Sequence, residues 1–214
     1  MPESTTSIVL VDDHRMFAES LARLLEDEGD IAVVGICGGA REALELTGRL
    51  PADVALVDYY LPGPDGVELV RQLKRLRPAM QVVMLTGSPD DRLLLAAIEA
   101  GCSGFLTKER AAAEVADAVR AVADGEALIS PQMLARLLPQ LGRNEQVPGS
   151  DLTERERELL PYLARGMTNR AIAAELFLSV NTVRNYVQSI LNKLGAHSKL
   201  EAVSLAVRAG IVEY

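Results

Sequence analysis

Five polar residues stand directly after strand-like apolar runs, and their chemical types indicate phosphoryl chemistry. Asp12 and Asp13 follow the first run, Asp58 the third, Thr86 the fourth and Lys108 the fifth. Because the carboxyl ends of parallel strands share one edge of a sheet, we expect these side chains to share one pocket. Three carboxylates repel one another unless a cation lies among them, and Mg²⁺ suits such oxygen ligands. Mg²⁺, an ammonium and a hydroxyl are what a transferring phosphoryl group needs around its oxygens.

Asp58 is the central carboxylate of this set. It ends the apolar run 54–57 and precedes the Pro- and Gly-rich stretch 59–66, which is typical of a buried strand leaving a sheet. A carboxylate at that point can act as a nucleophile and form an aspartyl phosphate. The alternative is structural, since a buried carboxylate could also cap the next helix or pair with a nearby lysine.

The scaffold for this pocket is predicted by a regular alternation of apolar runs and helical patterns. We expect five strands, at residues 7–12, 31–37, 54–57, 81–86 and 104–107. We expect a helix after each strand, at residues 14–29, 40–49, 65–76, 90–100 and 111–124. Such alternation predicts an α/β domain with a parallel, doubly wound five-stranded sheet.

The rest of the chain has no strand pattern. A helix is expected at 131–141, with an end made uncertain by Pro139, and the stretch 142–150 has the composition of a linker. Four more helices fit, at 153–165, 168–176, 179–194 and 198–209. Thr153 with Glu156, and Ser198 with Glu201, have the spacing of a capping box. Pro161 lies inside the first of them, so we expect a kink there or a shorter helix. We therefore divide the chain into residues 1–126, a connecting helix and linker at 127–150, and an all-helical domain at 151–214.

Charge and composition limit which partners and which cellular compartment the sequence allows. Residues 1–130 carry 12 Lys/Arg and 22 Asp/Glu, whereas residues 151–214 carry 8 and 7, so the two domains should meet different partners. No apolar run approaches the roughly 18 residues of a membrane helix, and the N-terminus lacks the pattern of a signal peptide. Cys37 and Cys102 stand at no metal-ligand spacing. We expect reduced, structural cysteines in a cytoplasmic protein.

The helix at 179–194 has one apolar face and one face of amide and guanidinium groups without a carboxylate. The polar face carries Asn181, Arg184, Asn185 and Gln188. Such groups pair with base edges in the major groove. An ordinary solvated helix face is the alternative, but the missing acids and the helix–turn–helix spacing favour DNA. The expected DNA contacts are Thr182, Arg184, Asn185, Gln188 and, to phosphate, Lys193.

The acidic site also resembles that of a known family. The motifs that carry the resemblance are Asp12-Asp13, Asp58 followed by Leu61-Pro62 and Asp65-Gly66, Thr86 and Lys108. Together they resemble the receiver domain of two-component response regulators, which implies a flavodoxin-like sheet in the order 2-1-3-4-5. The resemblance implies that Asp58 accepts a phosphoryl group from a sensor histidine kinase. It also implies that Asp13, Asp58 and the backbone carbonyl of Tyr60 bind Mg²⁺, with Asp12 acting mostly through water.

The same resemblance assigns roles to the remaining residues of the site. Lys108 would contact the phosphoryl oxygens, and Thr86 would turn inward to report the phosphate. Phe105 matches the switch aromatic of the family, although a single aromatic on a short strand could also be plain core. One departure is Glu109, which stands where many receivers carry proline.

Residues 152–212 resemble the LuxR/NarL-type helix-turn-helix domain. The matching motifs are Leu152-Thr153-x-Arg155-Glu156, Gly166-Met167-Thr168-Asn169-x-x-Ile172-Ala173 and Leu178-Ser179-x-x-Thr182-Val183-Arg184. Departures are Pro161 and Tyr186. The two resemblances cover nearly the whole chain and imply a NarL/FixJ-type response regulator. Such a protein is a phosphorylation-switched transcription factor that binds promoter DNA as a homodimer, with RNA polymerase as a further partner.

Two other function classes compete with this interpretation. One is a phosphatase with an aspartyl-phosphate intermediate, but Tyr60 occupies the position where that chemistry usually has a general acid. The other is a DNA binder whose receiver serves only for dimerisation. The complete acidic site argues against this class.

Tyr60 also predicts a long-lived phosphorylated form, because a bulky ring beside Asp58 would shield the phosphorus from water. Ser88 offers only a weak hydroxyl nearby. The alternative is that Tyr60 points to solvent.

Overall fold

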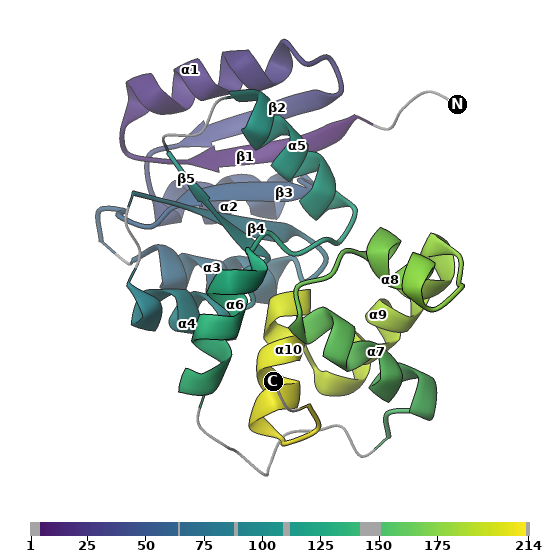
Figure 1. Cartoon of the computed structure of the whole chain (residues 1–214). Helices are drawn as coiled ribbons and strands as arrows, with labels where there is room; N and C mark the ends of the chain where they lie inside the picture. The colour runs from purple at the N-terminus through teal and green to yellow at the C-terminus, as the bar shows by residue number, and fades with distance from the viewer. Residues whose placement is uncertain (1–4, 64, 88–89, 109–111, 142–150, 213–214) are drawn as a thin grey trace.

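The computed structural model describes residues 5–63, 65–87, 90–108, 112–141 and 151–212, and a five-stranded parallel sheet forms the centre of its N-terminal half (Figure 1). The strands are β1 (Thr6–Val11), β2 (Ile31–Cys37), β3 (Val54–Asp58), β4 (Gln81–Thr86) and β5 (Gly104–Thr107). They pair in the order β2-β1-β3-β4-β5, which confirms the predicted topology. The order reverses between β1 and β3, and ligands of such sheets bind outside the carboxyl ends at this switch point.

Helices cover both faces of the sheet. They are α1 (Arg15–Glu26), α2 (Ala40–Arg49), α3 (Gly66–Leu76), α4 (Asp91–Glu99) and α5 (Ala112–Ala123). Apolar side chains of α1 and α5 pack on one face, and those of α2, α3 and α4 pack on the other. Because successive strand residues point to opposite faces, the uninterrupted apolar runs supply both cores.

Helix α1 departs from its prediction in two respects. It ends at Glu26, three residues before Gly29, which has a positive φ of 82° in the turn that follows. The helical spacing of Phe17, Leu21, Leu24 and Leu25 predicts one apolar face for this helix, but Leu24 is 50% exposed. The buried face is formed by Ala18, Leu21, Ala22 and Leu25.

The chain after α5 adds to the edge of the sheet, which the sequence did not predict. Residues 127–129 run beside β5, where Gly104 and Leu128 form a parallel bridge. The N–H of Phe105 donates to the carbonyl of Leu128 at 2.9 Å, and the N–H of Leu128 donates to the carbonyl of Ser103 at 3.0 Å. A Cβ at position 104 would overlap Leu128, so this pairing requires glycine.

A connecting helix follows at once. Helix α6 (Pro131–Leu137) begins with Ser130 as its N-cap and Pro131 in its first turn, and the 3-10 turn η1 (Leu138–Gln140) continues it. The predicted helix at 131–141 is therefore present, but its last turn tightens at Pro139, which cannot donate a helical hydrogen bond. The predicted linker at 142–150 lies outside the described residues.

The C-terminal part is all-helical, as predicted. It contains α7 (Glu154–Ala164), α8 (Asn169–Glu175), α9 (Val180–Leu194) and α10 (Lys199–Arg208). Thr153 and Glu156 form the predicted capping box of α7, and Ser198 caps α10. Helix α7 continues through Pro161 to Ala164, so the proline does not shorten it.

The two halves of the chain pack against each other through a shared apolar cluster. This cluster joins Leu94 and Ile98 of α4 and Leu134 of α6 to the core of α7–α10. In Figure 1 the C-terminal helices lie beside α6 at one end of the sheet. None of the described helices is long and apolar enough to cross a membrane.

Candidate phosphoacceptor and DNA-binding sites

The structure brings Asp12, Asp58 and Lys108 together at the carboxyl edge of the sheet. Both carboxylates are buried, because they stand at the ends of the central strands β1 and β3. The Lys108 Nζ, after β5, lies 2.7 Å from Asp12 Oδ2 and 2.8 Å from Asp58 Oδ2. Burial alone would lower the pKa of Lys108, but the hydrogen bonds to Asp12 and Asp58 outweigh it and raise the pKa. The pocket thus holds its ammonium charged beside the expected nucleophile.

The same edge has the features of a metal site. One ligand atom from each of Asp12, Asp13, His14 and Asp58 lies within 4.8 Å of the others. Three carboxylates against one ammonium leave negative charge in the pocket, and their oxygens are hard ligands, so a divalent cation such as Mg²⁺ fits the residues present. The fit rests on Asp12, Asp13 and Asp58, the carboxylates that the sequence indicated.

His14, at the start of α1, contacts both aspartates of the acidic pair. Its side chain is 69% exposed, in agreement with a residue at a helix start, yet its Nδ1 lies 3.0 Å from Asp13 Oδ1 and 3.2 Å from Asp12 Oδ1. Its backbone N–H also donates to Asp12 Oδ1 at 2.9 Å. His14 therefore helps to hold the acidic pair in place.

The loop after β3 curves over the Asp58 carboxylate. The N–H of Tyr60 donates to Asp58 Oδ1 at 3.3 Å, which places the backbone of residue 60 at the pocket. The Tyr60 side chain is 64% exposed and meets the ring of Tyr59 edge-on, with the centroids 4.7 Å apart. This exposure favours the alternative in which Tyr60 points to solvent. Its role as a shield and the metal contact of its carbonyl stay predictions, and Ser88 and Glu109 lie outside the described residues.

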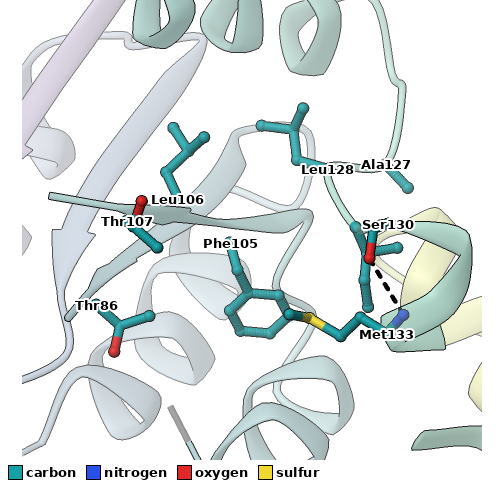
Figure 2. Close-up of a pocket in the computed structure, with 9 residues that line it drawn as sticks. Thr86, Phe105, Leu106, Thr107, Ala127, Leu128, Ser130 and Met133 are labelled. Carbon is teal, nitrogen blue, oxygen red and sulfur yellow. Dashed lines mark hydrogen bonds between the residues drawn. The ribbon is translucent and has the colours of Figure 1, made fainter. Parts of the chain in front are cut away.

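The two expected switch residues lie close together, beside the connecting helix. Thr86 at the end of β4 is buried, and Phe105 on β5 is half-buried. Both line a hollow of about 380 Å³ that Ser130 and Met133 also line. Figure 2 shows the Phe105 ring directed at the side chain of Met133 on α6. The prediction that Phe105 is a switch is untested, but its ring does contact the segment that leads to the C-terminal helices.

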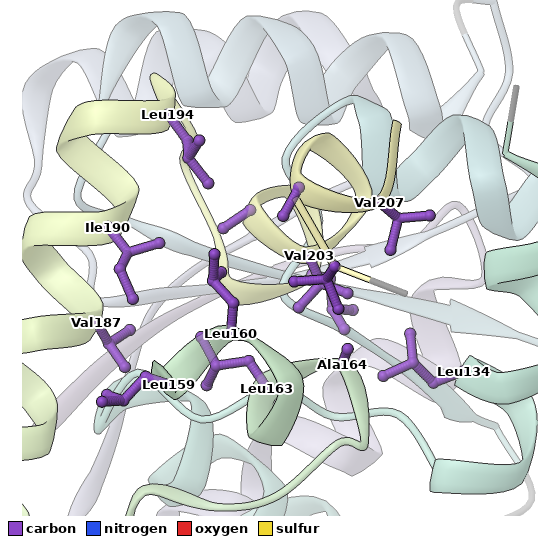
Figure 3. Packing of buried hydrophobic residues seen from close by; sticks show 14 of the residues in the cluster. Leu134, Leu159, Leu160, Leu163, Ala164, Val187, Ile190, Leu194, Val203 and Val207 are labelled. Carbon is purple, nitrogen blue, oxygen red and sulfur yellow. The ribbon is translucent and has the colours of Figure 1, made fainter. Parts of the chain in front are cut away.

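Helix α9 has the two faces that its sequence predicts. Val183, Val187, Ile190 and Leu194 are buried against α7 and α10, as Figure 3 shows for the last three. On the opposite face Arg184, Asn185 and Gln188 are exposed, and Thr182 lies in the first turn, where its hydroxyl is 2.7 Å from Ser179 Oγ. This arrangement presents amide and guanidinium groups outward on a rigid helix, as a recognition helix requires.

In this structure that face of α9 is turned toward the N-terminal half of the chain. Arg184 Nη2 lies 2.8 Å from Asp124 Oδ2, just after α5. Asn181, Arg184, Asn185 and Gln188 line one side of a hollow of about 380 Å³, and the loop after α5 lines the other. The side chains expected to contact DNA therefore share this hollow with the loop after α5.

Lys193, expected to contact phosphate, is engaged within the C-terminal domain. Its Nζ lies 2.7 Å from Glu156 Oε2 and 3.1 Å from the carbonyl of Asp151. Burial would raise the pKa of Glu156, but the hydrogen bonds from Lys193, Ser189 and Thr153 outweigh it and lower the pKa to about 2. The capping-box spacing predicted Glu156 as a cap, but not this ion pair. A phosphate contact by Lys193 stays a prediction.

Comparisons with known proteins agree with both sites. Residues 8–120 match the response regulator receiver domain, and residues 150–206 match the luxR family of bacterial regulatory proteins. The transcriptional regulatory protein LiaR of Bacillus subtilis is 35% identical over 207 residues, which cover 96% of this chain and 98% of LiaR. The DNA-binding transcriptional activator DevR/DosR of Mycobacterium tuberculosis is 37% identical over 201 residues, 93% of each chain.

A solved structure aligns with nearly the whole chain. The crystal structure of the response regulator ChrA, from a heme-sensing two-component system, aligns with a TM-score of 0.51 and 29% identity, over 98% of this chain and 100% of ChrA. The chain therefore belongs to the two-component response regulators that join a receiver domain to a luxR-type DNA-binding domain, a family of transcriptional regulators and not of enzymes.

Proposed function

We propose that this chain is a cytoplasmic transcriptional regulator switched by phosphorylation of Asp58. The observation that carries the proposal is the placement of the buried Asp58 carboxylate 2.8 Å from Lys108 Nζ, among carboxylates that suit a divalent cation. The proposed division is a receiver at 1–126, a connecting segment at 127–150 and a DNA-binding domain at 151–214. A sensor histidine kinase is the proposed phosphoryl donor.

In the proposed transfer, an Asp58 carboxylate oxygen attacks the phosphorus of a phosphohistidine. The P–N bond breaks, its electron pair stays on the imidazole nitrogen, and Asp58 becomes an acyl phosphate. Lys108 exchanges its bond to the free carboxylate for one to a phosphoryl oxygen. When bound by Asp13, Asp58 and the Tyr60 carbonyl, with Asp12 acting through water, Mg²⁺ supplies positive charge for the phosphoryl oxygens.

The output proposed for the phosphorylated form is DNA binding as a homodimer on an inverted repeat. One helix-turn-helix buries too little surface for tight, selective binding, and a two-fold pair doubles the contacts. Repacking of Thr86 and Phe105 would release the face of α9 from the receiver. Thr182, Arg184, Asn185 and Gln188 would then contact DNA, and bound promoters would be presented to RNA polymerase.

The first test is phosphorylation by acetyl phosphate with Mg²⁺, measured as intact mass. Wild type should gain one phosphoryl group and Asp58→Ala none. Addition of phosphate to Asp58→Ala at the wild-type rate would refute the assignment of Asp58 as the phosphoacceptor. No gain in wild type would favour a receiver that serves only for dimerisation.

The second test is selection of DNA sequences by the phosphorylated full chain, followed by affinity measurements on the selected site. Arg184→Ala should lower affinity and relax the preference at one base position. If it leaves both unchanged, the recognition helix is misassigned.

A further inference from the structure

Glu126 of the receiver forms an ion pair with a buried lysine of the DNA-binding domain. Lys199, the first residue of α10, is 5% exposed, and its Nζ lies 2.6 Å from Glu126 Oε2. The other carboxylate oxygen of Glu126 accepts from the backbone N–H of Asn169, the first residue of α8, at 2.8 Å. One acid group of the receiver thus binds two elements of the DNA-binding domain at once.

Lys199 stands beside the recognition helix. It lines the same hollow as Arg184, Asn185 and Gln188 of α9. Burial lowers the pKa of Lys199, Glu126 opposes that effect, and the guanidinium of Arg184 is near enough to lower the pKa further. Arg184 and Lys199 are therefore neighbouring cations on one surface, and each is paired here with an acid from the short loop 124–126.

The geometry of a helix-turn-helix places this surface at the DNA backbone. The second helix of the motif enters the major groove, and the first helix crosses the sugar-phosphate chain. In this chain the second helix is α9 and the first is α8. Glu126 contacts the start of α8, so its carboxylate lies on the side of the domain where that backbone would pass. A phosphate there would meet the ammonium that Glu126 now holds.

We propose that Lys199 contacts a DNA phosphate, adjacent to Arg184. In this structure, in which the two halves pack together, Glu126 and Asp124 of the receiver take the place of DNA phosphates. The Arg184–Asp124 pair is exposed and contributes little to the packing of the halves. The Lys199–Glu126 pair is buried between them, so separation returns both charged groups to water. The hydrated ammonium of Lys199 is then free to bind a DNA phosphate in place of the carboxylate. The proposal rests on the DNA binding proposed above, and it adds a residue outside the recognition helix.

The first measurement is the salt dependence of affinity for a mixed-sequence duplex, with the acetyl-phosphate-treated full chain. Each phosphate contact contributes about 0.9 to the slope of log K against log salt concentration. Lys199→Gln should reduce the slope by about that amount, for all duplex sequences alike. Lys199→Arg, which keeps the charge, should retain the wild-type slope. Arg155→Gln, an equal charge change on α7 away from the hollow, should also retain it.

The second measurement is the affinity of the untreated chain. Glu126→Gln should bind the duplex about fivefold or more tightly than wild type, because the carboxylate no longer competes. Asp117→Asn is the matched control, since it changes the net charge equally from an exposed position on α5. Melting curves identify any variant that fails to fold. If Lys199→Gln does not fold, Lys199→Ala, which also removes the charge, takes its place in the slope measurement.

The outcomes separate this proposal from the proposed function. A wild-type slope in folded Lys199→Gln, with DNA binding intact, overturns the phosphate contact and leaves the transcriptional role standing. Equal affinities of Glu126→Gln and Asp117→Asn overturn the role of Glu126. If the treated wild type and Glu126→Gln bind no duplex at all, the DNA-binding function itself fails.

Discussion

The ammonium of Lys74, on α3 of the receiver, donates to the backbone carbonyl of His197, in the turn between α9 and α10, at 2.9 Å. The same Nζ donates to the carbonyl of Met80 at 2.6 Å. Next to this bond, the hydroxyl of Ser198 donates to the carbonyl of Cys102 at 2.9 Å. Residues 197–199 therefore contact three different segments of the receiver, so this turn holds the two halves together at several points.

Lys74 should make stability depend on pH in the alkaline range. Burial lowers the pKa of Lys74 to about 8, and the nearby Cys102 and Glu201 only partly oppose this effect. An exposed lysine, as in the unfolded chain, has a pKa of about 10.4. The folded protein is therefore destabilised by the buried charge at low pH, and its stability rises once the pH exceeds about 8 and Lys74 loses its proton. Wild type should gain on the order of 2 kcal/mol relative to Lys74→Met between about pH 7 and 9.5. Denaturant unfolding of both proteins measures this difference, and a constant difference would contradict it.

Met133 should couple the receiver to the DNA-binding domain. Its side chain lies against Phe105 on one side, and α6 belongs to the core shared with α7–α10 on the other (Figure 2). In Met133→Ala, Asp58 should still be phosphorylated, but the ratio of DNA affinities with and without phosphate should fall several-fold, since coupling residues contribute roughly 0.5–2 kcal/mol. Met16→Ala, at an exposed position of α1, is the control. An unchanged ratio in Met133→Ala would remove this contact from the switch.

The fold and the pocket of Asp12, Asp58 and Lys108 could be predicted because they follow from periodic patterns. Parallel strands share one edge, so polar residues at strand ends converge even when 96 positions separate Asp12 from Lys108. The contacts between the two halves follow no such pattern. Glu126 with Lys199, and Phe105 with Met133, are single residues whose meeting depends on how the domains dock. The capping box predicted the place of Glu156, but its pairing with Lys193 depends on the packing of α7 on α9.

Glu156 should stabilise the DNA-binding domain above mildly acidic pH. The pKa of Glu156 in the folded protein is lowered to about 2. Its contribution to the free energy of unfolding is therefore complete at pH values above the ordinary pKa of glutamate. That contribution is lost as the pH falls toward the folded-state pKa. Glu156→Gln should lower the stability at neutral pH by roughly 1–3 kcal/mol, because Lys193 and Ser189 lose a charged acceptor. Glu158→Gln, at a more exposed position of the same helix, should change it little. Equal melting temperatures for the two variants would show that the pair contributes nothing.

Gly104 should be required for the strand-like pairing of residues 127–129. In Gly104→Ala the new methyl group would collide with the backbone of Leu128, so the hydrogen bonds to Ser103 and Phe105 should break. Hydrogen exchange at the amides of Phe105 and Leu128 should accelerate, and those of β1 should stay protected. Gly39→Ala is the control, because a Cβ there meets nothing within 4 Å. Unchanged protection at Leu128 would mean that the edge adapts to the methyl group.

Tyr60 should lengthen the lifetime of the phosphorylated form if its ring reaches the pocket. Hydrolysis needs water in line with the phosphorus, opposite the Asp58 oxygen, and the bond from the Tyr60 N–H to Asp58 places this residue at that entrance. Its ring is largely exposed here, so shielding requires the ring to turn inward once a phosphoryl group is present. Tyr60→Asn should lose phosphate several-fold faster than wild type, measured over time with Mg²⁺ present and donor removed. Tyr60→Phe keeps the ring and should retain the wild-type lifetime, whereas equal lifetimes in all three proteins would rule out shielding by Tyr60.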